Sequence, residues 1–147
     1  MKLTQLSLFL ENRPGQLRYP CEVLGKAGID ILTMSLADTQ QFGILRLIVK
    51  DHEQARKVLE AAGCVVNLTE VMAAEVLDRP GGLAEVLGAF EAAGLSIEYM
   101  YPFIAGHRDK TAVLVFRLED PDKAAPLLRG RGVKLLAREE VFARVGA

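Results

Sequence analysis

Residues 12–17 read Asn-Arg-Pro-Gly-Gln-Leu, and residues 78–83 read Asp-Arg-Pro-Gly-Gly-Leu. The second stretch follows the first at an offset of 66 positions, the difference between positions 78 and 12. The same offset joins further residues: Leu24 with Phe90, Gly28 with Gly94, Ile31 with Ile97 and Met34 with Met100. A repeat of this length, aligned at turn glycines and apolar positions, indicates a duplicated domain rather than a short solenoid unit.

The offset grows to 69 positions in the second half of each copy. There Asp51 matches Asp120, and Gly63 matches Gly132. The three additional residues predict a longer loop in the second copy, around residues 106–109.

Both copies show the same order of predicted elements. In the first copy, apolar and polar residues alternate over residues 6–10, as in a half-buried strand. The Pro-Gly dipeptide at residues 14–15 ends this strand, and apolar residues at helical spacing then run to Gly28, a typical helix stop. A strand, a strand, a helix and a last strand follow, over residues 30–37, 42–49, 51–63 and 64–68. The order is β-α-β-β-α-β.

This order predicts an α+β protein of two ferredoxin-like modules, each an antiparallel sheet with both helices on one face. We place the first module at residues 1–70 and the second at residues 71–147. Residues 65–77 read as nearly continuous strand, so no Gly/Ser/Pro linker separates the modules.

Some residues fit this scheme less simply. Pro20 and Pro126 fall inside predicted helices, where an interior proline removes a backbone donor. They indicate either late helix starts or bends. Glu139 and Glu140 lie in an end segment that reads as a strand with a solvated face.

The composition indicates a packed core and little net charge. Of the 147 residues, 50% are hydrophobic, and 18 basic against 19 acidic residues give a formal net charge of −1. This balance gives no basic footprint for a nucleic acid and no polybasic patch for an anionic membrane. The chain shows no signal-peptide core and no apolar run of the ~20 residues that a membrane helix needs. Cys21 and Cys64 lack metal-ligand or redox spacing, so we expect reduced thiols and a cytoplasmic protein.

The sequence shows no motif for catalysis or for cofactor binding. His52 and His107 belong to no ligand-spaced cluster, so we predict no metal site. No phosphate-cradling glycine motif occurs, and no serine or cysteine has a nearby candidate base. We therefore predict a protein that is not an enzyme and has no cofactor.

The repeated Arg-Pro-Gly-x-Leu follows Asn12 in one copy and Asp78 in the other, and precedes a helix that ends in Ala-Gly-(Ile/Leu)-x-Ile. This pattern resembles the signature of the ACT domain, and it covers essentially the whole chain, twice. The resemblance implies a free-standing tandem regulatory protein that binds a free amino acid. In ACT domains the ligand sits between this turn and the second strand of a neighbouring module. By position, the implied turn residues are Asn12, Arg13, Pro14, Gly15 and Gln16 in the first copy, and Asp78, Arg79, Pro80, Gly81 and Gly82 in the second. The implied facing walls are Thr33, Met34 and Ser35, and Tyr99, Met100 and Tyr101.

The turn also suits a zwitterion for physical reasons. It opens a helix, whose unpaired N–H groups and dipole favour a carboxylate. Asn12, Asp78 or a strand carbonyl can accept a hydrogen bond from an ammonium group. We favour the second copy as the working site, because Asp78 is charged and Gly82 leaves space where Gln16 has a side chain. A turn that serves only as scaffold is the alternative, since Asn/Asp-x-Pro-Gly is also good turn chemistry.

Tyr99 and Tyr101 share one face of their strand. They either form a wall for the ligand's side chain or simply pack the sheet. With Met100, they indicate a branched-chain or aromatic amino acid. Edge strands favour a homodimer. Two other hypotheses stay open: a regulatory subunit without a ligand of its own, which binds an enzyme of amino-acid metabolism, and a small enzyme on a ferredoxin-like scaffold.

Overall fold

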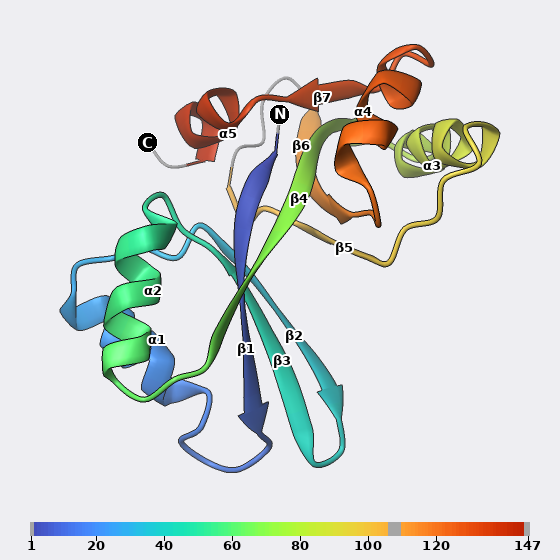
Figure 1. Ribbon diagram of the computed structural model, residues 1–147. Coiled ribbons are helices and arrows are strands. Elements are labelled where there is room, and N and C mark those ends of the chain that lie inside the picture. Colours follow the sequence, from blue (N-terminus) through green and yellow to red (C-terminus); the bar gives the residue numbers. More distant parts are fainter. Residues whose placement is uncertain (1, 106–109, 146–147) are drawn as a thin grey trace. The chain divides into compact units, whose positions relative to one another are not determined.

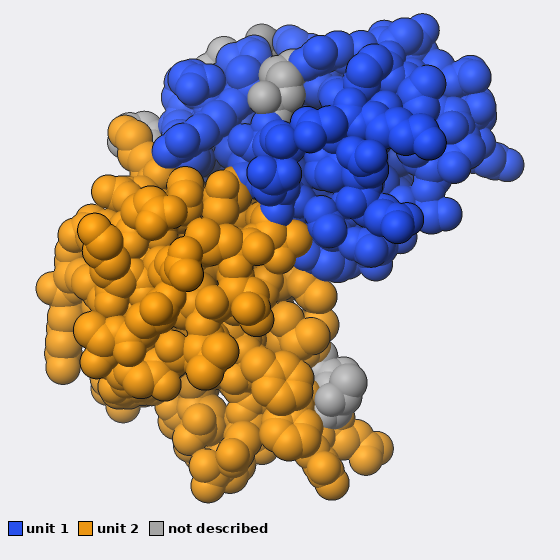
Figure 2. Space-filling model, in the orientation of Figure 1, with its two compact units in different colours: residues 1–3, 70–147 blue, residues 4–69 orange. Residues whose placement is uncertain are grey.

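Figure 1 shows a computed structural model of the chain, in which residues 2–105 and 110–145 are described. The predicted longer loop at residues 106–109 lies outside the described residues. The chain divides into two compact units, coloured separately in Figure 2. Unit 2 consists of residues 4–69, and unit 1 consists of residues 1–3 and 70–147.

Unit 2 folds as a βαββαβ module. Its elements are β1 (Leu3–Glu11), α1 (Arg18–Lys26), β2 (Thr33–Thr39), β3 (Phe42–Ile48), α2 (His52–Ala61) and the first residues of β4 (Val66–Leu77). The strand order is β2-β3-β1-β4, and β3 is antiparallel to both β1 and β2. Alternate residues of a strand point to the same side, and Leu6 and Leu8 of β1 thereby join a buried cluster with Leu24 of α1 and Leu59 of α2.

Unit 1 repeats this module and adds a helix. Residues 70–77 of β4 are its first strand, and they are followed by α3 (Gly82–Ala92), β5 (Tyr99–Pro102), β6 (Thr111–Arg117), α4 (Pro121–Arg129), β7 (Lys134–Leu136) and α5 (Arg138–Val145). The strand order is β5-β6-β4-β7, and neighbouring strands are antiparallel. Its core brings together Met72 of β4, Phe116 of β6, Phe90 of α3 and Leu128 of α4. The prediction of an α+β fold with ferredoxin-like modules is confirmed.

The local signals in the sequence explain where several helices begin. Asp51 and Asp120 each cap a helix, and each carboxylate accepts the backbone N–H three residues later at 3.1 Å. Pro20 is the third residue of α1, in the first turn, where a backbone donor has no helical acceptor to lose. The interpretation as a late helix start is therefore correct for Pro20, whereas Pro126 lies inside α4.

The prediction of a strand at the end of the chain is wrong, because Glu139 and Glu140 lie in the first turn of α5. The Ala137 N–H donates to the Glu140 carboxylate at 3.1 Å, which satisfies a donor at the helix start. Near the other end of α5, the Arg144 side chain is 7% exposed and pairs with Glu75 of β4 at 2.6 Å. This contact joins residues far apart in the sequence, so the local polarity pattern gave no sign of it.

Candidate functional site

The first Arg-Pro-Gly turn joins β1 to α1 in unit 2. The backbone N–H of Asn12 donates to the Gln41 carbonyl at 2.8 Å, and its Nδ2 donates to the Gln40 carbonyl at 3.0 Å. Asn12 therefore ties this turn to the turn between β2 and β3. Gly15 has a φ of +88°, a conformation that glycine adopts without steric cost. Asn12 and Gly15 therefore both stabilise the conformation of the turn, whether or not it binds a ligand.

A small hollow opens beside the first turn. Three motif residues and parts of β1, β2 and β3 line it: Leu10, Glu11, Asn12, Arg13, Leu17, Leu36 and Gly43. Its volume is about 90 Å³, well below the ~300 Å³ at which small-molecule pockets usually begin. The two charged lining residues, Arg13 and Glu11, pair with each other at 2.7 Å. The hollow therefore offers an apolar surface for part of a ligand, and unit 2 alone does not enclose a whole one.

Sequence reasoning named Met34 on β2 but missed Leu36, which lines the hollow. In the β2–β3 register, Met34 lies opposite Leu47, and Leu36 lies two residues further along the same face. A Cβ at Gly43 would lie 3.1 Å from Leu36 Cδ1, so a side chain at position 43 would press on this wall. A glycine inside a strand often marks such a close approach, and this signal was available in the sequence.

The second Arg-Pro-Gly turn joins β4 to α3. Gly81 has a φ of +84° and caps α3, which begins at Gly82. Gly82 is buried, and a Cβ there would overlap the carbonyl oxygen of Leu77. The space expected at Gly82 is therefore occupied by the end of β4. Arg79 pairs with Glu85 of α3 at 2.7 Å.

The other predicted residues lie on the turn surfaces or on outer strands. Exposed motif residues are Asn12, Arg13, Pro14, Gly15, Asp78, Arg79, Pro80 and Gly81, and Gln16 is half-buried. Tyr99 and Tyr101 share a face of β5, with ring centroids 6.4 Å apart, and the exposed Met100 points to the other face. The order of strands places β6 between β5 and β4, and β3 between β2 and β1. Within each unit, one strand therefore separates the predicted wall residues from the strand that leads into the turn.

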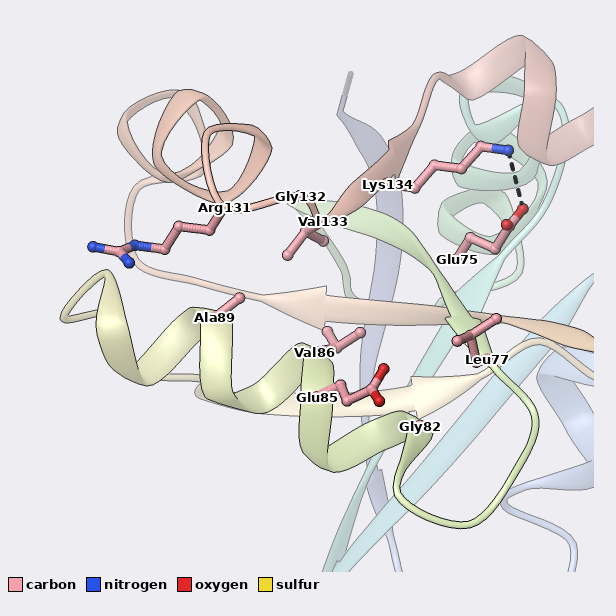
Figure 3. Close-up of a pocket in the computed structure, with 10 residues that line it drawn as sticks. All are labelled: Glu75, Leu77, Gly82, Glu85, Val86, Ala89, Arg131, Gly132, Val133 and Lys134. Atoms are coloured by element: carbon pink, nitrogen blue, oxygen red, sulfur yellow. Dashed lines mark ion pairs between the residues drawn. The ribbon is translucent and has the colours of Figure 1, made fainter.

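A larger groove, of about 300 Å³, lies beside α3 in unit 1 (Figure 3). It runs between α3 and the segment that leads from α4 into β7, with the end of β4 beside them. Its lining residues are Glu75, Leu77, Gly82, Glu85, Val86, Ala89, Arg131, Gly132, Val133 and Lys134. Only Gly82 among them belongs to the predicted site.

The described residues give no sign of metal or thiol chemistry. Among residues 2–105 and 110–145, no group of three or more His, Cys, Asp or Glu side chains is placed to hold a metal ion. Burial raises the pKa of the Cys21 and Cys64 thiols, so both stay protonated and weakly nucleophilic at neutral pH. None of the helices in the described part of the chain is long and apolar enough to cross a membrane.

The doubled βαββαβ fold, with its Arg-Pro-Gly turn in each unit, defines a pair of ACT-type modules. The sequence profile of the ACT domain pair matches residues 1–144. The chain therefore belongs to the ACT domain pair family, which confirms the resemblance seen in the sequence.

Solved structures agree with this assignment. Protein BT0572 from Bacteroides thetaiotaomicron is 39% identical, with a TM-score of 0.88 over 97% of this chain and 96% of that one. The regulatory subunits of aspartate kinase from Thermus thermophilus and Thermus flavus are each 16% identical, with TM-scores of 0.63 and 0.62. They align with 88% of this chain and with 93% and 90% of their own chains. At this identity the likeness to the kinase subunits shows the fold alone. No curated protein matches the chain significantly.

Proposed function

We propose that this protein is a regulator that binds a free amino acid at the first Arg-Pro-Gly turn. One observation carries the proposal: the ACT domain pair covers residues 1–144, and each unit has its Arg-Pro-Gly turn at the junction of first strand and first helix. The ACT family is a regulatory ligand-binding family. The aspartate kinase subunits with the same fold are regulatory as well, which supports a regulatory rather than a catalytic role.

The first turn offers a partner to each part of an amino acid. At the start of α1, the Tyr19 N–H already donates to the Gly15 carbonyl at 3.1 Å, and Pro20 has no N–H. The backbone N–H groups that precede Tyr19 suit the carboxylate, and Gly15 permits a close approach to the backbone. The carboxamide oxygen of Asn12 is an acceptor for the ammonium group. Leu10, Leu17 and Leu36 give the ligand's side chain an apolar surface. The small hollow favours a branched aliphatic side chain over an aromatic ring.

We place the ligand at the first turn rather than the second, against the expectation from the sequence. The room that Gly82 was expected to provide is taken by the Leu77 carbonyl, and Arg79 is held by Glu85. The first turn has the apolar hollow directly beside it.

The hollow needs a second wall, and we propose that a neighbouring module in a homodimer supplies it. C₂ homodimers are the commonest soluble oligomers. Ligand binding would then shift an association equilibrium, and through it an enzyme of amino-acid metabolism in the cytoplasm. The alternative is a regulatory subunit that binds such an enzyme without a ligand of its own.

A thermal-unfolding screen against the common free amino acids tests the proposal. A ligand at 100 times its Kd should stabilise the protein by ~2.7 kcal/mol. Gly43→Val narrows the hollow and should remove the shift, whereas Leu36→Ala widens it and should transfer the preference to a larger side chain. A screen without any shift would refute the sensor and leave the ligand-free subunit as the working hypothesis.

A further inference from the structure

The groove of Figure 3 exists because β7 is short. β7 pairs with β4 only over residues 73–75, so Leu77 lies beyond the paired stretch and lines the groove. Helix α3 forms one wall, and residues 131–134 form the other (Figure 3). This groove is separate from the hollow at the first turn, which lies in the other unit.

The two walls carry opposite charges. Arg131 and Lys134 belong to one wall, and Glu85 belongs to the other. In Figure 3 the exposed Arg131 side chain extends toward the C-terminal end of α3, away from Glu85. Lys134 pairs with Glu75 at 3.4 Å, and Glu85 pairs with Arg79 at 2.7 Å in an exposed contact, which is worth little in water. Within the described part of the chain, the Arg131 guanidinium has no ion-pair or hydrogen-bond partner. A free guanidinium is the side chain best shaped to hold a carboxylate.

The first copy has a groove at the equivalent positions, with a different lining. Residues of the groove in unit 2 match those in unit 1 at the repeat offsets of 66 and 69: Phe9 with Glu75, Gln16 with Gly82, Tyr19 with Glu85, Pro20 with Val86, Gly63 with Gly132, Cys64 with Val133 and Val65 with Lys134. Both copies therefore have the groove, lined largely by aromatic and apolar residues in unit 2 and partly by charged residues in unit 1.

The two grooves also differ in the contact between their walls. In unit 2 the Tyr19 hydroxyl donates to the Ala62 carbonyl at 2.8 Å, a neutral bond that links the walls directly. The matching residues in unit 1 are Glu85 and Arg131, at offsets of 66 and 69. Unit 1 therefore has a carboxylate on one wall and a guanidinium on the other, in place of a bond between them.

We propose that the groove in unit 1 is a second ligand site, for a small zwitterionic amino carboxylic acid. The exposed Arg131 side chain turns toward the groove and binds the ligand's carboxylate, and Glu85 binds its ammonium group. Val86, Ala89 and Val133 line the groove between these charges and contact the ligand's carbon chain. Glu75 is already paired with Arg144 and Lys134, so the preference for a zwitterion rests on the opposite charges of Glu85 and Arg131.

The test is an NMR titration of the ¹⁵N-labelled full chain with glycine, β-alanine, γ-aminobutyrate and ε-aminohexanoate, which differ in the separation of their charges. The backbone amides of Gly82, Val86 and Gly132 report on the groove, and those of Asn12 and Gly43 report on the first turn. We expect at least one probe to shift the groove amides at millimolar concentration. Glu85→Gln and Arg131→Gln should each weaken this binding about tenfold, as the loss of a charged hydrogen bond does.

Matched variants separate the proposal from a general charge effect. Arg79→Gln removes only the residue that competes for Glu85, so binding should persist or tighten. Arg56→Gln and Glu60→Gln remove an exposed pair on α2, with atoms 2.6 Å apart, and should change nothing. The proposal is overturned if no probe shifts the groove amides, or if Glu85→Gln and Arg131→Gln leave the affinity unchanged. Shifts at the turn alone contradict only this inference. Binding at the first turn is contradicted separately, if a branched aliphatic amino acid added to the same sample shifts neither Asn12 nor Gly43.

Discussion

Replacing Gly82 with alanine tests how closely α3 approaches the end of β4. The added Cβ would overlap the Leu77 carbonyl oxygen, so the helix start or the strand end must move. Overpacking of this kind costs about 1–3 kcal/mol. Helix propensity acts in the opposite direction and favours alanine over glycine by about 0.5–1 kcal/mol. We therefore expect a net loss of up to about 2.5 kcal/mol in the free energy of unfolding.

Gly88→Ala on the same helix is the matched control. Gly88 is exposed, and a Cβ there meets nothing within 4 Å. Only the propensity term remains, so Gly88→Ala should stabilise the protein by about 0.5–1 kcal/mol. Urea unfolding followed by circular dichroism compares the two variants, with the midpoint reporting stability where the slope is unchanged. If Gly82→Ala unfolds at the same urea concentration as Gly88→Ala, or at a higher one, the close approach is refuted.

Three further changes test other parts of the structure. Arg144→Gln removes the partner of a largely buried carboxylate, Glu75. Because Lys134 still neutralises that carboxylate, we expect the free energy of unfolding in urea to fall by only about 1–3 kcal/mol. A change smaller than the experimental error would contradict the anchoring of α5 by this ion pair. Asp120→Ala deletes the cap of α4 and should cost about 1 kcal/mol, whereas Asp120→Asn should restore most of it. Burial raises the pKa of the Cys21 and Cys64 thiols, so the thiolate forms at a higher pH in the native protein than in the urea-unfolded chain. The rate of alkylation by iodoacetamide should therefore begin to rise at a higher pH in the native protein. If the rates in the two states depend on pH in the same way, the burial effect is disproved.

The elements that were predicted correctly are those whose signals are local. The helix start at residue 51, the stop at Gly28 and the alternation along β1 depend on residues within one turn or one strand. The repeat supported these predictions independently, because each predicted strand and helix had to occur in both copies in the same order. Residues 65–77, read as continuous strand, proved to lie almost wholly in one strand, β4.

The features that the sequence did not reveal depend on contacts between distant residues. Helix α5 is held by Arg144 on Glu75, 69 positions away, and its adjacent glutamates suit a solvated strand and a helix start equally well. Gly82 was interpreted as free space, because the sequence cannot show that Leu77 fills it. The hollow at the first turn involves Leu36 and Gly43 from two further strands, and only the glycine inside a strand pointed to it.

The two copies differ at the surfaces where a small molecule would bind and agree where the fold requires it. Asp51 and Asp120 cap equivalent helices in the same way, whereas Tyr19 and Glu85 occupy equivalent positions with unlike chemistry. The apolar hollow lies in unit 2 and the charged groove in unit 1, so the two cavities that we propose as binding sites differ in chemistry. If the sites are coupled, occupation of either changes the affinity of the other by the same factor. Measuring the affinity of the groove for its zwitterion with the hollow empty, and then with the hollow saturated by an amino acid, gives that factor directly. A factor of one means that the two units bind their ligands independently, and any other value means that binding in one unit is coupled to binding in the other.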